Sequence, residues 1–205
     1  AFLSLIVATL LAACAPAPAP TPTPVPLTPI PTVKRVVLII AHKGFRDEEY
    51  TEPRAILEAK GFEVTVASSS LETATGMLGA QVQPDILVSD IAVGDYDAIV
   101  FIGGTGSAEY WDDPEAHRIA QEAVAQGKVL AAICAGPVTL ARAGVLEGKR
   151  ATVANLTWKQ GIEELQAAGA TVTDADVERD GLIITASGPP ASTEFGEEIA
   201  RALEE

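Results

Sequence analysis

The sequence predicts an α/β fold with a mostly parallel central sheet that is covered by helices on both faces. Two observations predict it. Short apolar runs without polar alternation indicate strands buried on both faces, and segments of helical length separate these runs. The clearest runs are residues 33–41, 97–102 and 128–133. In sheets of this kind ligands bind beyond the carboxyl ends of the strands, so candidate site residues are sought there.

The first half of the charged region begins with the strand at residues 33–41. Pro53 suits only the first turn of a helix, so we expect a helix from about residue 53 to Lys60. Gly61 then ends it, as glycine commonly does just past a helix. The remaining strands predicted in this half are residues 62–68 and, more weakly, 81–82 and 86–88.

The second half contains a helix with clear start and stop signals. Asp113 caps it and Pro114 opens it, and Gly127 ends it. Its predicted apolar face consists of Ala116, Ile119, Ala120 and Ala123. The other elements expected here are strands at residues 97–102, 128–133 and 182–185, a helix starting just after Cys134, and helices at residues 158–168 and 193–203.

Composition divides the 205 residues into two parts. Residues 1–32 contain no charged residue and eight of the 14 prolines, whereas residues 33–205 carry every charge. The net charge of −14 argues against a nucleic-acid partner, because phosphate binding needs Lys and Arg, and against electrostatic binding to anionic lipid. Two cysteines exclude a disulfide framework. The spacing of Cys and His fits no metal site, and no cofactor is expected.

Residues 1–13 are predicted to be a signal peptide. Their apolar stretch is shorter than the roughly 20 residues of a membrane span and suits the hydrophobic region of a secretory signal. Residues 11–14, Leu-Ala-Ala-Cys, resemble the lipobox of bacterial lipoproteins, which implies cleavage before Cys14 and lipidation of that residue. Residues 14–32 then form an extended Pro-rich linker and residues 33–205 the folded domain. The expected location is the bacterial cell envelope, lipid-anchored on the extracytoplasmic side; a plain signal peptide is the alternative.

The densest signal for chemistry is the segment 129–137, Val-Leu-Ala-Ala-Ile-Cys-Ala-Gly-Pro. A buried strand leads into Cys134, then into small residues and a helix start, which is the strand–turn–helix arrangement of a nucleophile elbow. At a helix start the dipole favours the thiolate, and free backbone amides can hold an oxyanion. A buried structural cysteine is the other interpretation.

The segment 132–137, Ala-Ile-Cys-Ala-Gly-Pro, resembles the nucleophile motif of the PfpI/ThiJ superfamily, which includes the parkinsonism-associated deglycase. Three further segments resemble the family in the family's order: residues 43–49 with its acidic residue, 101–104 with its Gly pair, and 180–189 with its last strand and turn. The resemblance covers about residues 34–204. It implies a flavodoxin-like three-layer sandwich, like that of class I glutamine amidotransferase-like proteins, and a homodimer.

The resemblance also implies roles for single residues. Cys134 is the expected nucleophile, and Glu49 the protonated carboxyl that hydrogen-bonds its sulfur. The backbone amides of Gly104 and Ala135 are the expected oxyanion pocket. A carboxylic acid that donates to a thiolate lowers the cysteine pKa. The alternative for Glu49 is an exposed acid at a helix start, which the dipole also favours.

The chain departs from the family at two positions. Hydrolase-like members carry His directly after the cysteine, where this chain has Ala135, and deglycase-like members carry a His in the segment corresponding to residues 152–156, which contains none. His42, after the first strand, is a candidate substitute base or merely a loop residue; His117 is expected on a helix surface. Without a general base, hydrolysis loses roughly 10²–10⁴ in rate, which disfavours a cysteine peptidase or amidase. Trp111 either edges the pocket or packs internally.

Three classes of function remain open. The leading one, whose substrate class comes from the resemblance, is a cysteine-dependent enzyme of glyoxalase or deglycase type that acts on small reactive carbonyls or their adducts. The second is a redox-responsive protective protein in which oxidation of Cys134 is the output. The third is a surface-tethered binding domain. The expected partner is a small carbonyl or an oxidant, and the membrane is contacted only through the Cys14 lipid.

Overall fold

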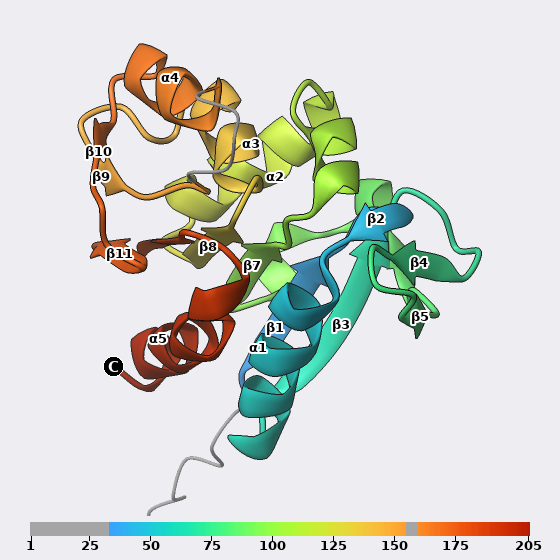
Figure 1. The fold of residues 1–205 in the computed structure, drawn as a ribbon. Coiled ribbons are helices and arrows are strands. Elements are labelled where there is room, and N and C mark those ends of the chain that lie inside the picture. The colour runs from blue at the N-terminus through green and yellow to red at the C-terminus, as the bar shows by residue number, and fades with distance from the viewer. Residues whose placement is uncertain (1–32, 155–159) are drawn as a thin grey trace, which may run out of the picture. The chain divides into compact units, whose positions relative to one another are not determined.

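The computed structural model describes residues 33–154 and 160–205, so the predicted signal peptide, Cys14 and the Pro-rich linker lie outside the described residues. The described chain folds around a seven-stranded sheet in the order β11-β12-β8-β7-β1-β3-β6 (Figure 1). The strands are β1 (Arg35–Ile39), β3 (Glu63–Ser68), β6 (Ile86–Leu87), β7 (Ala98–Phe101), β8 (Val129–Ile133), β11 (Val177–Asp180) and β12 (Ile183–Ala186). Only β11 of this sheet pairs antiparallel. The predicted α/β fold is confirmed.

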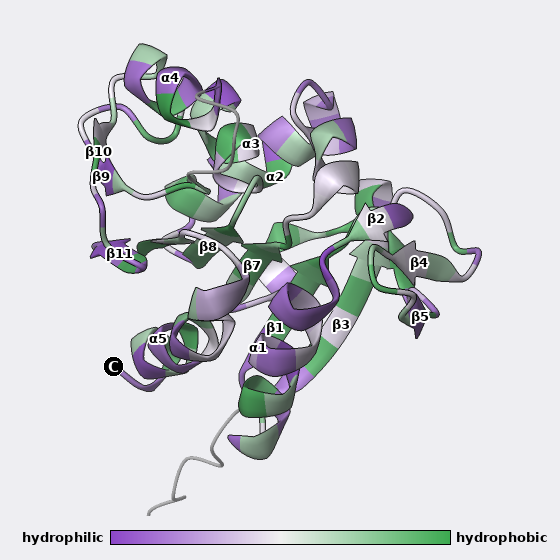
Figure 2. Cartoon of the chain, viewed as in Figure 1, coloured by the Kyte–Doolittle hydropathy of each residue, from purple (hydrophilic) through white to green (hydrophobic). Residues whose placement is uncertain are grey.

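Alternate residues of the central strands enter two separate cores. In β1, Val36 and Leu38 face one core while Val37 and Ile39 face the other, and all four are fully buried. The first core lies under α1 (Asp47–Ala59) and α5 (Ser192–Glu204), which pack side by side (Figure 1). The second lies under α2 (Pro114–Ala125), α3 (Pro137–Arg142) and α4 (Gln160–Ala167). Figure 2 shows the apolar strands between these two helical layers.

The start of α2 confirms the capping prediction. The Asp113 carboxylate accepts a hydrogen bond from the amide of Ala116 at 2.7 Å, and Pro114 occupies the first turn. The buried residues of α2 are Ala116, Ile119, Ala120 and Ala123, which are the predicted apolar face. The predicted helix at residues 158–168 is found as α4, and its first two residues lie outside the described chain.

The predicted start of the first helix is wrong. Helix α1 begins at Asp47, so Pro53 lies inside it rather than in its first turn. An interior proline lacks the N–H that the helix needs, which costs about 3 kcal/mol. Two features compensate here: Asp47 and Glu48 in the first turn interact favourably with the helix dipole, and α5 packs closely at this point. A Cβ added to Gly196 would lie 2.8 Å from the Pro53 Cα.

Two small sheets, which the sequence did not predict as sheets, flank the central one. The first contains β2 (Lys43–Phe45), β4 (Ala74–Gly76) and β5 (Gln81–Val82); the second contains β9 (Arg150–Ala151) and β10 (Thr171–Val172). Asp47 holds the β4–β5 turn, because its carboxylate accepts the amides of Leu78 at 2.8 Å and Ala80 at 2.7 Å. Helix α1 is thereby fixed to a segment that follows Asp47 by 31 to 33 residues.

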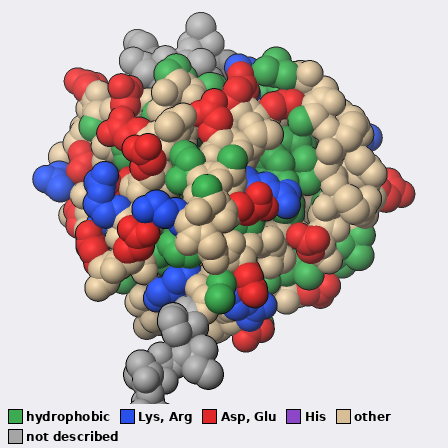
Figure 3. Space-filling view, turned by 90° about the horizontal axis from the view of Figure 1, so that it is seen from below, with side chains coloured by type: hydrophobic (Ala, Val, Ile, Leu, Met, Phe, Trp, Pro, Cys, Tyr) green, Lys and Arg blue, Asp and Glu red, His purple; other side chains and the backbone are tan. Residues whose placement is uncertain are grey.

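On the face shown in Figure 3, acidic side chains are spread among Lys and Arg rather than gathered in one patch. This distribution is that of a mixed, well-solvated surface. Within residues 33–154 and 160–205, the helices are all too short or too polar to cross a bilayer.

Candidate active site

Cys134 lies on a strained turn directly after β8. Its φ of 64° makes it the single non-glycine residue with positive φ in the described chain. Such backbone costs energy and persists only when its surroundings hold it. Here the Cys134 amide donates to the Ala186 carbonyl at 2.9 Å, and the Cys134 carbonyl accepts from the Ala154 amide at 2.9 Å. The predicted nucleophile-elbow geometry is therefore present, and α3 begins at Pro137.

Two glycines allow this turn to form against its neighbours. A Cβ on Gly136 would lie 2.8 Å from the Phe101 carbonyl oxygen. A Cβ on Gly103 would lie 2.5 Å from Glu49 Oε2 and 2.7 Å from the Cys134 Cβ. Gly103 therefore marks the place where the carboxyl and the cysteine approach each other, and any side chain there would push them apart.

Glu49 lies in the first turn of α1 and is fully buried. Neither of its carboxyl oxygens has a hydrogen-bond partner of full geometry among the described residues. Burial is the main cause that raises the pKa of Glu49 from 4.5 to about 7, offset in part by the Cys134 side chain, the positive charge of Arg46 and the Gly103 amide. The alternative of an exposed acid does not fit this position. Glu49 instead holds or releases a proton near neutral pH.

The thiol of Cys134 does not have the lowered pKa that the helix start suggested. Burial and the negative charge of Glu49 raise it to about 12, and the backbone amides of Gly104 and Ala135 offset this only in part. Glu49 and Cys134 therefore titrate as a pair. The pair releases one proton near neutral pH and keeps the second, which can reside on the carboxyl or on the sulfur.

Both amides that the family resemblance implies for an oxyanion pocket interact with the Cys134 sulfur. The Gly104 and Ala135 amides each interact with the sulfur closely enough to lower the pKa of the thiol. They project from two different elements, the turn after β7 and the elbow after β8. The structure thus brings together Cys134, Glu49, Gly104 and Ala135.

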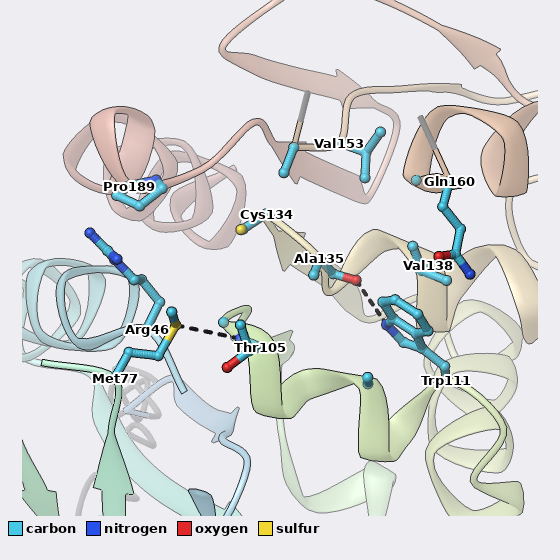
Figure 4. Close-up of a pocket in the computed structure, with 14 residues that line it drawn as sticks. Arg46, Met77, Thr105, Trp111, Cys134, Ala135, Val138, Val153, Gln160 and Pro189 are labelled. Carbon is cyan, nitrogen blue, oxygen red and sulfur yellow. Dashed lines mark hydrogen bonds between the residues drawn. The ribbon is translucent and has the colours of Figure 1, made fainter. Parts of the chain in front are cut away.

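A pocket of about 240 Å³ opens beside Cys134 at the carboxyl ends of the central strands (Figure 4). The residues that line it come from the segments after β2, β4, β7, β8, β9 and β12 and from α3 and α4. Met77, Val138, Val153 and Pro189 contribute apolar side chains, and Arg46 contributes a charged one that is paired with Glu48 at 2.8 Å.

Trp111 both edges the pocket and packs internally, so the two interpretations of the sequence hold together. Its indole N–H donates to the Ala135 carbonyl at 3.2 Å (Figure 4). The Arg142 guanidinium lies 5.4 Å from the ring centroid, and His117 bonds the Trp111 carbonyl at 2.7 Å. His117 is half-buried and fixes Trp111 rather than standing free on the surface.

His42 does not line the pocket. Its amide donates to Glu109 at 3.1 Å, and its carbonyl accepts from the Thr75 amide at 2.9 Å, so it joins the start of β2 to β4. Within the described ranges no histidine lines the pocket, and no cluster of three or more His, Cys, Asp or Glu side chains could bind a metal ion. The proton-accepting group that the structure does place beside the thiol is Glu49.

The sequence did not predict the apolar wall of the pocket. Met77 and Val153 lie in short turns and edges without periodicity, so no local pattern marks them. Pro189 lies in the segment that resembles the family's C-terminal turn, and its proximity to Cys134 could have been inferred from that resemblance alone. The close approach at Gly103 could have been predicted from the sequence, because Gly103 is the first residue of a Gly pair at the end of a strand.

A single thiol on a strained elbow, faced by a buried carboxyl and two amides, defines the class of α/β proteins with a cysteine nucleophile elbow. Residues 34–202 match the DJ-1/PfpI family. The chain belongs to this family.

Relatives and solved structures agree with this assignment. An uncharacterized protein of Methanocaldococcus jannaschii is 43% identical over 171 residues, which cover 83% of this chain and 82% of the relative. A protein of Pyrococcus abyssi named a deglycase is 33% identical over 153 residues, covering 75% of this chain and 90% of that protein. The crystal structure of a ThiJ/PfpI domain protein from Brachyspira murdochii has a TM-score of 0.80 at 30% identity, covering 84% of this chain and 97% of that one.

Proposed function

We propose that this protein is a cysteine-dependent enzyme of glyoxalase or deglycase type that acts on small reactive carbonyls or their adducts. The observation that carries the proposal is the Cys134–Glu49 pair at the end of a pocket, with two backbone amides directed at the sulfur. Relatives named deglycases in Pyrococcus abyssi and Thermococcus kodakarensis, 33% and 34% identical, support the substrate class.

In the proposed reaction the Cys134 sulfur attacks the aldehyde carbon, and a C–S bond forms while the carbonyl electron pair moves to oxygen. The thiol proton moves to Glu49 during attack, because the pKa of Glu49, about 7, lets it accept a proton at neutral pH. No free thiolate has to accumulate, which suits a thiol whose own pKa is raised. Glu49 thereby does the work for which hydrolase-like relatives use a histidine.

The developing oxyanion needs donors that are already in place. The amides of Gly104 and Ala135 already face the sulfur, so an oxygen bonded to a carbon on that sulfur falls within their reach. Protonation of this oxygen by Glu49 gives the hemithioacetal and returns the carboxylate. Removing one such donor from an oxyanion site typically costs about 10²–10³ in rate.

The test is consumption of methylglyoxal by the purified protein, with Cys134→Ser as the variant and Cys14→Ser as the matched control. We expect Cys134→Ser to abolish turnover and Cys14→Ser to retain it, because Cys14 precedes the described residues that form the site. Turnover by Cys134→Ser at the wild-type rate, or no turnover by wild type, would overturn the proposal.

A redox-responsive role is the second candidate, and the lack of any histidine among the described pocket residues favours it. Without an imidazole, Glu49 has to serve as the general base in every catalytic cycle. Oxidation of Cys134 does not require a base that is regenerated in each cycle. The raised thiol pKa argues the other way, since the thiolate is the form that peroxide oxidises. A stable gain of one or two oxygens on Cys134 under mild peroxide, without carbonyl turnover, would favour this role. The same missing histidine disfavours the peptidase function.

We also propose that the domain is held at the extracytoplasmic side of a bacterial membrane by a lipid on Cys14. The support is the lipobox-like residues 11–14 and the Pro-rich residues that follow. Metabolic labelling with a fatty-acid analogue in a bacterial host should label the wild type and not Cys14→Ser. Equal labelling of both proteins would contradict the anchor.

A further inference from the structure

Resting on the proposed function, we infer that the pocket selects α-oxoaldehydes with a branched or otherwise bulky hydrocarbon substituent over those with a hydroxylated or charged one. Among the described residues, a polar reacting end made by Cys134 and two amides lies against a pocket lining that is mostly hydrocarbon. Because the reacting end holds the aldehyde group, the substituent must lie against the hydrocarbon lining.

Aliphatic side chains surround the reacting end. Val138 of α3 and Val153 after β9 lie beside the elbow, and Met77 and Pro189 also line the pocket (Figure 4). Val153 occupies the segment in which deglycase-like members carry a histidine. Hydrocarbon at that position gives a substituent nothing to hydrogen-bond, so a buried hydroxyl there would lose its water without replacement.

Three polar side chains among the described residues that line the pocket already have partners. The indole N–H of Trp111 donates to the Ala135 carbonyl, and the Arg46 guanidinium pairs with Glu48. The Gln160 side chain hydrogen-bonds Glu164 and so helps to lower the pKa of that carboxyl. Glu48 already balances the charge of Arg46, so a charged substituent that loses its water gains less there than it would from an unpaired guanidinium, whereas a hydrocarbon substituent loses no such hydration.

The cavity is also larger than the smallest α-oxoaldehydes need. Its volume is about 240 Å³, while methylglyoxal presents one methyl group beyond its two carbonyls. Each further buried methylene gains roughly 0.8 kcal/mol, which corresponds to about fourfold in binding. Met77 can adapt to such a group, because its side chain is unbranched and flexible.

The chemical step is the same for every substituent. The thiol of Cys134 adds across the aldehyde C=O to give a hemithioacetal, in which sulfur is bonded to carbon and the thiol proton ends on oxygen through Glu49. Nothing is oxidised or reduced in this addition. Differences in rate between substrates therefore report the fit of the substituent, once intrinsic aldehyde reactivity is divided out.

The experiment compares kcat/KM for the matched pair 2-oxobutanal and 3-hydroxy-2-oxopropanal, which differ by methyl against hydroxyl, and for 4-methyl-2-oxopentanal. Each value is divided by the rate at which the same aldehyde adds to a small free thiol. We expect the two hydrocarbon substrates to exceed the hydroxylated one by about tenfold or more. Turnover with equal or reversed preference would overturn the inference and leave the proposed function standing.

Neighbouring residues supply a matched pair of variants. Met77 lines the pocket and Leu78 does not, and both side chains are exposed, by 42% and 63%. We expect Met77→Gln to reduce the hydrocarbon preference by roughly threefold or more and Leu78→Gln to leave it unchanged. Should Met77→Gln fail to fold, Val153→Thr with the exposed Val124→Thr as control replaces the pair. An equal effect of the pocket variant and its control would contradict the inference.

Alkylation of Cys134 separates the pocket from the catalysis. Iodoacetamide, iodoacetate and N-benzyl iodoacetamide share one reacting carbon and differ in the attached group, and peptide mass analysis distinguishes Cys134 from Cys14. Relative to a free thiol, we expect the benzyl reagent to modify Cys134 fastest and iodoacetate slowest. This order without aldehyde turnover would keep the inference and overturn the proposed function; the reverse order, or no reaction at Cys134, would overturn the inference.

Discussion

Two carboxylates in the first turn of α1 lie two residues apart and enter two regions that treat a negative charge in opposite ways. Asp47 turns to the β4–β5 hairpin, where the amides of Leu78 and Ala80 donate to it. Glu49 enters the region beside Cys134, where neither oxygen has a partner of full geometry in the described chain and burial raises the pKa to about 7. A carboxylate with fixed donors holds structure, whereas one without them keeps an exchangeable proton.

The largest expected effect tests the Glu49 region directly. Glu49→Gln retains the shape of the side chain but cannot accept a proton, so we expect kcat/KM to fall by about 10²–10⁴. The wild-type kcat/KM should rise as the pH passes through about 7, the pKa of Glu49, and the variant should lose this rise. A pH profile of kcat/KM for both proteins measures the two effects. A Glu49→Gln protein with an unchanged profile would assign the proton transfer elsewhere.

The same carboxyl should make stability depend on pH. Below about pH 4.5 both the folded and the unfolded state hold the proton; between about 4.5 and 7 only the folded state holds it. The free energy of unfolding therefore falls as pH rises across this range and then levels off, by roughly 3 kcal/mol in total. Denaturant unfolding of wild type and Glu49→Gln at several pH values should show this difference between the two curves. Parallel curves would mean that burial does not shift this pKa.

A third substitution fills the space at Gly103, where the side chains of Glu49 and Cys134 approach each other. Gly103→Ala places a Cβ 2.5 Å from Glu49 Oε2 and 2.7 Å from the Cys134 Cβ. We expect a loss of about 1–3 kcal/mol in stability from overpacking together with a marked loss of activity. Gly94→Ala is the control, because the nearest atom to its Cβ is 3.6 Å away. Thermal melts and turnover assays compare the two, and equal behaviour would contradict the tight approach.

The smallest effect on activity is expected in the Asp47 region. Asp47→Asn keeps one acceptor but loses the charge that strengthens two backbone hydrogen bonds, so we expect about 1–3 kcal/mol of destabilisation. Its kcat/KM should change far less than that of Glu49→Gln when both are assayed well below their melting temperatures. A collapse of activity in folded Asp47→Asn would erase the distinction between the two regions.

The central sheet could be predicted because its signals are local. The strands β1, β7 and β8 are continuous apolar runs, and Asp113 with Pro114 marks the start of α2. The start of α1 could not be predicted from Pro53, because the compensating contact comes from Gly196 in α5. The antiparallel β11 was missed for a similar reason: its residues are half-buried and carry no clear alternation.

The site divides in the same way. Cys134 is predictable from a strand that ends in small residues, and Gly104 and Ala135 follow from that turn and from the family resemblance. Glu49 came from the resemblance alone, since three adjacent acids look alike until the fold buries one of them. His42 has a suggestive position after β1, but its backbone bonds direct it to β4 and away from the pocket. Met77 and Val153 reach the pocket only through long-range packing.

The elbow at Cys134 is held by a hydrogen bond from the Ala154 amide and by one that the Cys134 amide donates to the Ala186 carbonyl, and both partners follow Cys134 in the chain. When Cys134 emerges from the ribosome during synthesis, the residues that hold its strained backbone have therefore not yet emerged. The thiol can take up its reacting geometry only after β12 has emerged and joined β8. The order of synthesis thus delays assembly of the site around Cys134 until the domain is nearly complete. A truncated product that ends before β12 would contain the cysteine but not the assembled site.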